Sequence, residues 1–194
     1  MRIGIYSGSF NPVHVGHISL VEYIVKHNIV DQVWLIRSPQ NPLKVNSSLL
    51  SDEHRAEMLR LATEGRQGLS ISTIEDNLPK PNYTINTLRA LQEEYPDEEF
   101  YLIIGADNWD IFDKWKDWDI IIRDFHLIVY PRPGYEYPEI DQESFPTVQV
   151  VDAPQFDLSS TEIRDLIKEG EPITGYVDEK VEEYIIANNL YNEQ

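Results

Sequence analysis

Two histidines three positions apart, His14 and His17, follow a turn of small residues near the start of the sequence. The turn, 8–12 (Gly-Ser-Phe-Asn-Pro), stands between a short apolar stretch and an apolar-periodic one, as at a strand-to-helix junction. The first N–H groups of a helix have no partners of their own, and such a site favours phosphate. If the helix begins near Pro12, both imidazoles lie on one face of its first turn. Gly16 between them leaves room for a ligand to approach the backbone.

The histidine pair is open to three interpretations. The residues could be ordinary histidines at a helix terminus, two ligands of a zinc ion, or groups that stabilise charge on a reacting phosphate. Zinc is disfavoured, because no third His or Cys stands nearby with ligand spacing. The glycine-containing turn before the pair favours the phosphate interpretation.

A second polar group, Ser159-Ser160-Thr161-Glu162 followed by Arg164, stands near the other end of the sequence. Alone it is the pattern of a plain helix cap, with Ser159 or Ser160 as the N-cap. A helix start with an arginine on the same turn also suits phosphate oxygens, because its N–H groups and its dipole attract anions.

Apolar stretches of strand length alternate with helical segments along the chain. Strands are expected at 3–7, 32–37, 69–74, 100–104, 126–130 and 148–151, and helices at 14–27, 51–64, 83–95, about 109–115, 159–168 and 179–187. This alternation predicts an α/β fold, a Rossmann-like open and mainly parallel sheet with helices on both faces. The polar segment 38–51 is long for a compact domain and predicts a functional loop.

In an open parallel sheet, ligands bind beyond the carboxyl ends of the strands. The residues of chemical interest fall after successive expected strands: Gly8–His17, Lys44, Thr84, Gly105–Asp107 and Arg132. Their convergence predicts a single site, and it is stronger support than any one motif.

The composition narrows the classes of function. The chain has 194 residues, 41% hydrophobic and 26% charged, which fits one globular domain over 1–194 with a helical segment over about 159–194. It contains no cysteine, which excludes disulfides and thiol catalysis. No apolar run is long enough to span a bilayer and no signal-peptide pattern is present, so a cytoplasmic protein without a membrane partner is expected.

The net charge is −18, with only 16 Lys and Arg residues. Most of this surface would repel a phosphate polymer, so nucleic acid is not an expected partner. A small phosphorylated substrate remains possible if its charge is met locally. The oligomeric state is left open.

Both polar groups resemble known signatures. Gly8–His17 resembles the H-x-G-H signature of a nucleotidyltransferase superfamily, and Leu158–Arg164 resembles its second signature, I-S-S-T-x-I-R. Within that superfamily the chain resembles the bacterial nicotinate mononucleotide adenylyltransferases over essentially its whole length. The segments that carry this resemblance are 82–88, 103–108, Trp115 with Trp118, 131–134 and 184–191. Two positions depart from the family pattern: Asn11 stands where Asp is common, and Leu43-Lys44 stands where His-Lys is usual.

The resemblance implies adenylyl transfer from ATP to nicotinate mononucleotide, which gives nicotinate adenine dinucleotide and pyrophosphate. It implies catalytic roles for His14, His17, Lys44 and Arg164. The residues it implies for ATP are Gly8, Ser9, Phe10, His14, His17, Gly105, Asp107, Ser160, Thr161 and Arg164. Those it implies for nicotinate mononucleotide are Ser9, Phe10, Lys44, Thr84, Trp115 and Arg132. Mg²⁺ is expected as cofactor, held mainly by the triphosphate and water rather than by protein ligands.

Some assignments have structural alternatives. Trp115 could stack on the pyridine ring or be a core residue beside Phe112. Asp107 could accept a ribose hydroxyl, cap the next helix, or do both, and Arg132 could meet the ring, the ribose or the phosphate. Other functions are a transferase that accepts nicotinamide mononucleotide or another small phosphorylated molecule, and, more remotely, a catalytically silent nucleotide sensor.

Overall fold

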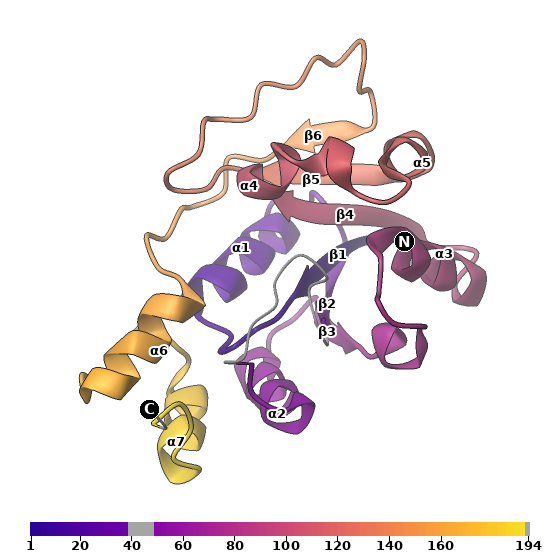
Figure 1. Cartoon of the computed structure of the whole chain (residues 1–194). Helices are drawn as coiled ribbons and strands as arrows, with labels where there is room; N and C mark the ends of the chain where they lie inside the picture. Colours follow the sequence, from indigo (N-terminus) through magenta and orange to yellow (C-terminus); the bar gives the residue numbers. More distant parts are fainter. Residues whose placement is uncertain (39–48, 193–194) are drawn as a thin grey trace.

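The computed structural model describes residues 1–38 and 49–192, and this part of the chain folds around a six-stranded parallel sheet (Figure 1). The strand order is β3-β2-β1-β4-β5-β6, and every neighbouring pair is parallel. The strands are β1 (Arg2–Gly8), β2 (Gln32–Arg37), β3 (Leu69–Ser72), β4 (Glu99–Gly105), β5 (His126–Tyr130) and β6 (Val148–Val150).

Helices connect the strands, as the parallel pairing requires. They are α1 (Val15–Lys26), α2 (Asp52–Thr63), α3 (Thr84–Glu94), α4 (Ala106–Trp109), α5 (Trp118–Asp124), α6 (Ser160–Glu169) and α7 (Glu179–Ala187), with the 3₁₀ turns η1 (Ile74–Asn77) and η2 (Phe112–Lys114). The predicted open α/β fold is therefore confirmed. None of the helices in the described ranges is long and apolar enough to cross a membrane.

The sheet has a hydrophobic core on each face, because successive side chains of a strand point to opposite sides. Ile3 and Ile5 of β1 join the core that contains α3, η2 and α5. Tyr6, on the other face, joins the core that contains α1, α2, α6 and α7. The central strand is thus buried from both sides, and its carboxyl end opens toward the loops that carry the predicted site.

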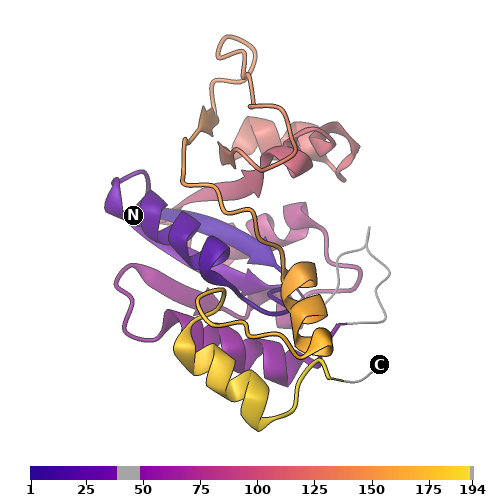
Figure 2. The same ribbon diagram turned by 90° about the vertical axis from the view of Figure 1, so that its left-hand side faces the viewer.

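The C-terminal helices return to the N-terminal half of the chain. Figure 2 shows α7 beside α2, and both contribute to one core through Val181 and Ile185 of α7 and Met58 of α2. His54 of α2 also forms a 2.9 Å hydrogen bond between its Nδ1 and the hydroxyl of Tyr184. The chain end is therefore packed against elements that flank β1 and β2.

Three sequence-based boundaries were wrong. The strand expected at 69–74 ends at Ser72, where η1 begins. The helix expected at about 109–115 is two short pieces, α4 and η2, and the following helix α5 was not predicted. Asp117, between η2 and α5, adopts a left-handed backbone conformation with a φ of 53°. The residue types around it do not predict this conformation. Helix α1 begins at Val15 rather than near Pro12.

Candidate functional site

The histidine pair forms a reciprocal cap at the start of α1. His14 is the N-cap residue, and its Nδ1 accepts the N–H of Gly16 at 3.1 Å. The Nδ1 of His17 accepts the N–H of His14 at 3.2 Å. The two ring centroids lie 3.7 Å apart. Since each Nδ1 accepts a hydrogen bond, the proton of each neutral ring is on Nε2.

Both histidines are neutral at pH 7. Burial, followed by the nearby positive charge of Arg132, lowers the pKa of His14 from 6.5 to about 4. Burial is also the main reason that the pKa of His17 lies well below its usual value, followed by the repulsion that a protonated His14 would exert and by the charge of Arg132. In the described residues neither Nε2 has a hydrogen-bond acceptor. The pair therefore offers two N–H donors of fixed tautomer rather than two cations.

The turn before the histidines has carbonyls bonded within the protein and backbone N–H groups left available. The carbonyl of Gly8 accepts the N–H of Ser38 at 2.8 Å, and the carbonyl of Ser9 accepts a hydrogen bond from Arg55 at 2.7 Å. Phe10 has a φ of 44° and a buried ring whose centroid lies 5.1 Å from that of His17. The N–H groups of Ser9 and Phe10 have no acceptor in the part of the chain that the structure describes. These amides are available to an anion, as a phosphate site needs.

Helix α6 begins with a complete capping box. The Oγ of Ser159 accepts the N–H of Glu162 at 3.2 Å, and the Oε2 of Glu162 accepts the N–H of Ser159 at 2.7 Å. The helix-cap interpretation of this segment is therefore correct, with Ser159 rather than Ser160 as the cap. The cap leaves the first two N–H groups of the helix, those of Ser160 and Thr161, free to bind an anion.

The same helix start is bonded to the histidine turn. The hydroxyl of Ser160 donates to the carbonyl of Pro12 at 2.8 Å, and Nη1 of Arg164 donates to the carbonyl of Asn11 at 2.8 Å. Nη2 of Arg164 donates to Thr161 Oγ1 at 3.1 Å. The two sequence signatures, from opposite ends of the chain, thus form one structural unit.

The carboxyl ends of β4 and β5 add a charged pair. Arg132 donates to Asp107 Oδ2 at 3.2 Å, and the other oxygen, Oδ1, is buried without a hydrogen-bond partner among the described residues. A Cβ on Gly105 would lie 2.5 Å from Cδ of Arg132, so only glycine fits beneath this pair. Gly105 is the N-cap of α4 and Asp107 makes no cap bond, so the capping alternative for Asp107 was wrong.

Thr84 and Trp115 lie in neighbouring segments. Thr84 is the first residue of α3, and Lys116 lies over the ring of Tyr83 at 4.7 Å from its centroid. Trp115 is half-buried against Phe112, with ring centroids 5.3 Å apart, and its buried Nε1 has no acceptor among the described residues. The packing against Phe112 agrees with the core interpretation, and the unpaired N–H leaves the ligand interpretation open. Within the described ranges, no hydrogen bond or ring contact joins Thr84 or Trp115 to the histidine pair.

Lys44, predicted to lie over the phosphates, falls outside the described residues, as does Leu43. In the described part of the chain, no three or more His, Cys, Asp or Glu residues are grouped so that they could hold a metal ion.

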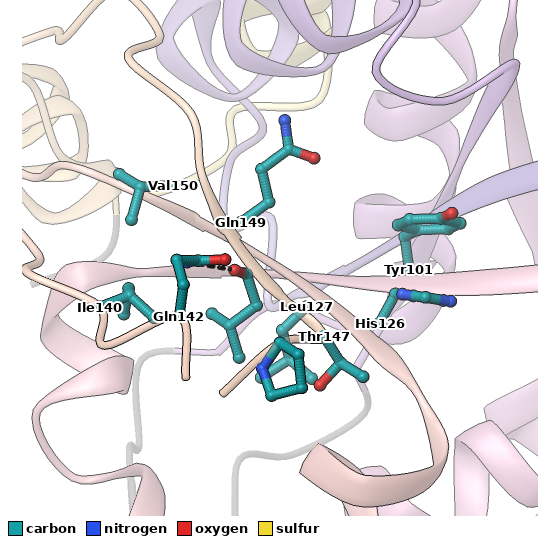
Figure 3. Close-up of a pocket in the computed structure, with 10 residues that line it drawn as sticks. Tyr101, His126, Leu127, Ile140, Gln142, Thr147, Gln149 and Val150 are labelled. Atoms are coloured by element: carbon teal, nitrogen blue, oxygen red, sulfur yellow. Dashed lines mark hydrogen bonds between the residues drawn. The ribbon is translucent and has the colours of Figure 1, made fainter. Parts of the chain in front are cut away.

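A separate hollow of about 580 Å³ lies near the amino ends of β4 and β5 (Figure 3). Tyr101 and His126 stack there with ring centroids 4.5 Å apart, and Gln142 donates to the carbonyl of Val148 at 3.0 Å. None of the predicted site residues lines it. It is at the wrong end of the strands for the ligand site of a parallel sheet.

Two features near the turn were not predicted from the sequence. Tyr6 and Tyr130 approach each other with hydroxyls 3.3 Å apart beside the histidines. Arg55 of α2 is fully buried. The sequence does contain an indication that Arg55 is special. It occupies the apolar, buried face of its helix with Met58 and Leu59, where a charged side chain is unusual.

Comparison with known proteins agrees with this arrangement. A family model described as cytidylyltransferase-like matches residues 5–166. A probable nicotinate-nucleotide adenylyltransferase of Flavobacterium johnsoniae is 43% identical over 191 residues, which cover 98% of this chain and 99% of the relative. One from Bacteroides thetaiotaomicron is 42% identical over 186 residues, which cover 95% of this chain and 91% of the relative.

The fold is also similar to solved structures. The nicotinic acid mononucleotide adenylyltransferase of Plasmodium falciparum complexed with NaAD superposes with a TM-score of 0.82 at 21% identity, over 100% of this chain and 98% of that chain. At that identity the likeness bears on the fold alone.

Proposed function

This chain belongs to the cytidylyltransferase-like family and, within it, to the nicotinate-nucleotide adenylyltransferases, and on that premise we propose that it transfers the adenylyl group of ATP to nicotinate mononucleotide. The products are nicotinate adenine dinucleotide and pyrophosphate, and the reaction serves NAD biosynthesis.

One observation carries this proposal beyond the family membership. Ser160 and Arg164 are hydrogen-bonded to the carbonyls of Pro12 and Asn11, so the two halves of a phosphate site are joined directly. A triphosphate has a reacting end and a leaving end, and both must be held in one line for transfer. Two anion-binding elements fixed to each other meet that requirement.

The chemistry needs no protein nucleophile. A phosphate oxygen of nicotinate mononucleotide forms a bond to the α-phosphorus of ATP while the bond to the bridging oxygen of pyrophosphate breaks. The electron pair of the broken bond leaves with pyrophosphate. Catalysis then consists of alignment and of stabilising the charge on the phosphorus-bound oxygens. The absence of cysteine from the chain is consistent with this route.

The histidine turn suits the reacting phosphate. The Nε2–H groups of His14 and His17 would donate to oxygens on the α-phosphorus, together with the backbone N–H groups of Ser9 and Phe10. Neutral donors held by backbone caps need no reorganisation as charge builds up, which is the property of an oxyanion site. Lys44, from its loop, would add a positive charge.

The start of α6 suits the leaving pyrophosphate. The backbone N–H groups of Ser160 and Thr161 and the unused donors of Arg164 would meet the β- and γ-phosphates, with the helix dipole assisting. The hydroxyl of Ser160 already donates to Pro12, so we assign its contribution to the backbone N–H rather than to the side chain.

The acceptor half is assigned to the middle of the chain. Trp115 would stack on the pyridine ring, and Thr84 at the start of α3 would bind the carboxylate or the phosphate. Arg132, whose positive charge acts on both histidines, would meet a phosphate. Gly105 and Asp107 would take a ribose of ATP, and the buried Oδ1 of Asp107 is an acceptor suited to a ribose hydroxyl.

Magnesium enters this proposal with ATP. The described residues do not form a carboxylate set that would hold the ion, and Asp107 is paired with Arg132. Mg²⁺ commonly keeps several waters and binds through substrate phosphates. The ion is therefore part of the substrate, MgATP, and no protein residue is assigned to it.

The proposed site draws on residues from 8 to 164, and Tyr191 is hydrogen-bonded to its turn. We therefore propose that 1–194 acts as one domain, whose 159–194 segment completes the phosphate site. A cytoplasmic location is part of the same proposal.

The test uses purified protein, MgATP and each mononucleotide separately, with pyrophosphate release as the measurement. We expect fast release with nicotinate mononucleotide, slow release with the nicotinamide form, and almost none from a His17→Ala variant. Faster reaction with the nicotinamide form would overturn the acceptor assignment. ATP binding without pyrophosphate release would instead identify a nucleotide sensor.

A further inference from the structure

Arg55 is a fully charged side chain with no exposure to solvent. It lies in the first turn of α2, and its guanidinium reaches the base of the histidine turn. A charge is found in a protein interior only where hydrogen bonds replace its water, so the partners of a buried arginine indicate its purpose.

The guanidinium uses three of its five N–H donors on the loops at the carboxyl ends of β1 and β2, and a fourth on its own helix. Nη1 donates to the carbonyl of Ser9 at 2.7 Å and to that of Ser38 at 2.9 Å, and Nε donates to the carbonyl of Leu50 at 3.1 Å. Nη2 pairs with Asp52 of its own helix. Three carbonyls from three separate segments are thus held by one rigid, planar group.

The bond to Ser9 determines where the next N–H points. The Ser9–Phe10 peptide is trans, so its C=O and N–H lie in one plane and point in opposite directions. With the Ser9 carbonyl held on the α2 side, the N–H of Phe10 points away from α2 and has no acceptor among the described residues. Phe10 is also held at a φ of 44°, a conformation that a residue with a Cβ does not maintain without support.

We propose that Arg55 is a positioning residue of the transfer reaction, which holds the Ser9–Phe10 peptide with its N–H directed at the phosphate. The inference rests on the proposed function for the identity of the bound group. Arg55 does not touch that group itself, because its donors are used on the protein. A lysine could not replace it, since one ammonium on a flexible stem does not span the carbonyls of Ser9, Ser38 and Leu50.

The test compares Arg55→Lys and Arg55→Ala with Met58→Ala. Met58 is buried on the same helix face one turn later, and its side chain has no polar contact with the turn. The first measurement is the affinity for α,β-methylene-ATP by calorimetry, at a temperature where circular dichroism shows each variant folded. The second is kcat with MgATP and nicotinate mononucleotide. Ethylguanidinium is then added to Arg55→Ala to refill the site.

We expect both Arg55 variants to bind the analogue about tenfold more weakly or worse and to lose kcat, since misdirected donors weaken binding and alignment. Met58→Ala should lose stability but keep its affinity, and ethylguanidinium should restore only Arg55→Ala. Unchanged affinity in a folded Arg55→Lys, or an equal loss in Met58→Ala, would overturn the proposal. If Arg55→Ala does not fold, Arg55→Lys decides. Failure of the wild type to use nicotinate mononucleotide would reject the proposed function, while the analogue titrations would still test Arg55.

Discussion

The hydroxyl of Tyr191 donates a 2.8 Å hydrogen bond to Oδ1 of Asn11, across a separation of 180 residues. The same oxygen accepts the N–H of Leu50 at 3.3 Å, and Asn11 is buried. Asn11 stands where the resembling family commonly has Asp. An amide oxygen accepts these bonds as a carboxylate would and avoids burying a charge, so the substitution keeps the acceptor that the turn requires.

Tyr191→Phe tests this link. Removing the hydroxyl leaves Asn11 Oδ1 with one donor fewer, and a lost buried hydrogen bond of this kind costs about 1 kcal/mol. We expect the free energy of unfolding in urea to fall by that amount, with a modest rise in KM for ATP. Tyr176→Phe, at a residue 42% exposed, is the control and should change neither value. Equal stability of Tyr191→Phe and wild type would show that the bond contributes nothing.

His17→Ala should lower kcat by about 10²-fold or more, because it removes one donor of fixed tautomer from the reacting phosphate. It also removes the ring that accepts the N–H of His14. Steady-state kinetics measure the effect. The control is His126→Ala, which removes an exposed histidine. Near-normal turnover in the His17 variant would exclude it from the mechanism.

Stability should fall as the solution is made mildly acidic. His14 has a pKa of about 4 in the folded protein, against 6.5 without burial, so the unfolded chain binds more protons between these values. This stability is complete above pH 6.5 and is lost as the pH falls through about 4. His17 acts in the same direction. From His14 alone we expect a loss of about 2 kcal/mol between pH 7 and pH 5.

Urea titrations of wild type and His14→Asn at the two pH values measure this loss. The variant should lose less stability than the wild type, because its residue at position 14 does not titrate. His126→Asn, which replaces an exposed imidazole, should behave as the wild type does. Parallel losses in wild type and His14→Asn would contradict the pH prediction.

Arg164→Ala should mainly raise KM for ATP, by about tenfold or more, because charge-assisted contacts to phosphate are strong ones. A smaller part of the effect comes from releasing the Asn11 carbonyl. Arg123→Ala removes an exposed arginine whose one ion pair among the described residues is with its neighbour Asp124, and it should leave KM unchanged. An unaltered KM for ATP in the Arg164 variant would mean that the pyrophosphate lies elsewhere.

Trp115→Ala should raise KM for nicotinate mononucleotide far more than KM for ATP, because a stacking surface of the ring is lost. Trp115→Phe should restore part of that loss. Trp34→Ala, which removes a half-buried indole from the same core on β2, controls for general loosening. The reverse pattern, with ATP affected more, would place the pyridine ring at another site.

Elements with a regular pattern were predictable from the sequence. The bounds 32–37 and 126–130 of β2 and β5 agree with the expected ones, because both strands are apolar and end at polar or proline residues. The helices after β4 were not predictable in this way. The left-handed Asp117 interrupts a segment that the apolar pattern of the sequence shows as continuous.

The contacts that build the site were predictable only in part. The resemblance to the superfamily's two signatures implied that 8–17 and 158–164 serve one ATP site, and hydrogen bonds from Ser160 and Arg164 join the two segments. The roles of Arg55 and Tyr191 depend on which carbonyl or amide each side chain reaches. Those distances come from tertiary packing, which local residue types do not encode.

The bonds from Ser160, Arg164 and Tyr191 to the histidine turn also have a consequence for how the protein is made. The turn leaves the ribosome well before Ser160, Arg164 and Tyr191, which follow their partners in it by 148, 153 and 180 residues. A nascent chain can form the early strands while its nucleotide turn still lacks these partners. The hydrogen bonds that hold the turn are therefore complete only after Tyr191 has been translated.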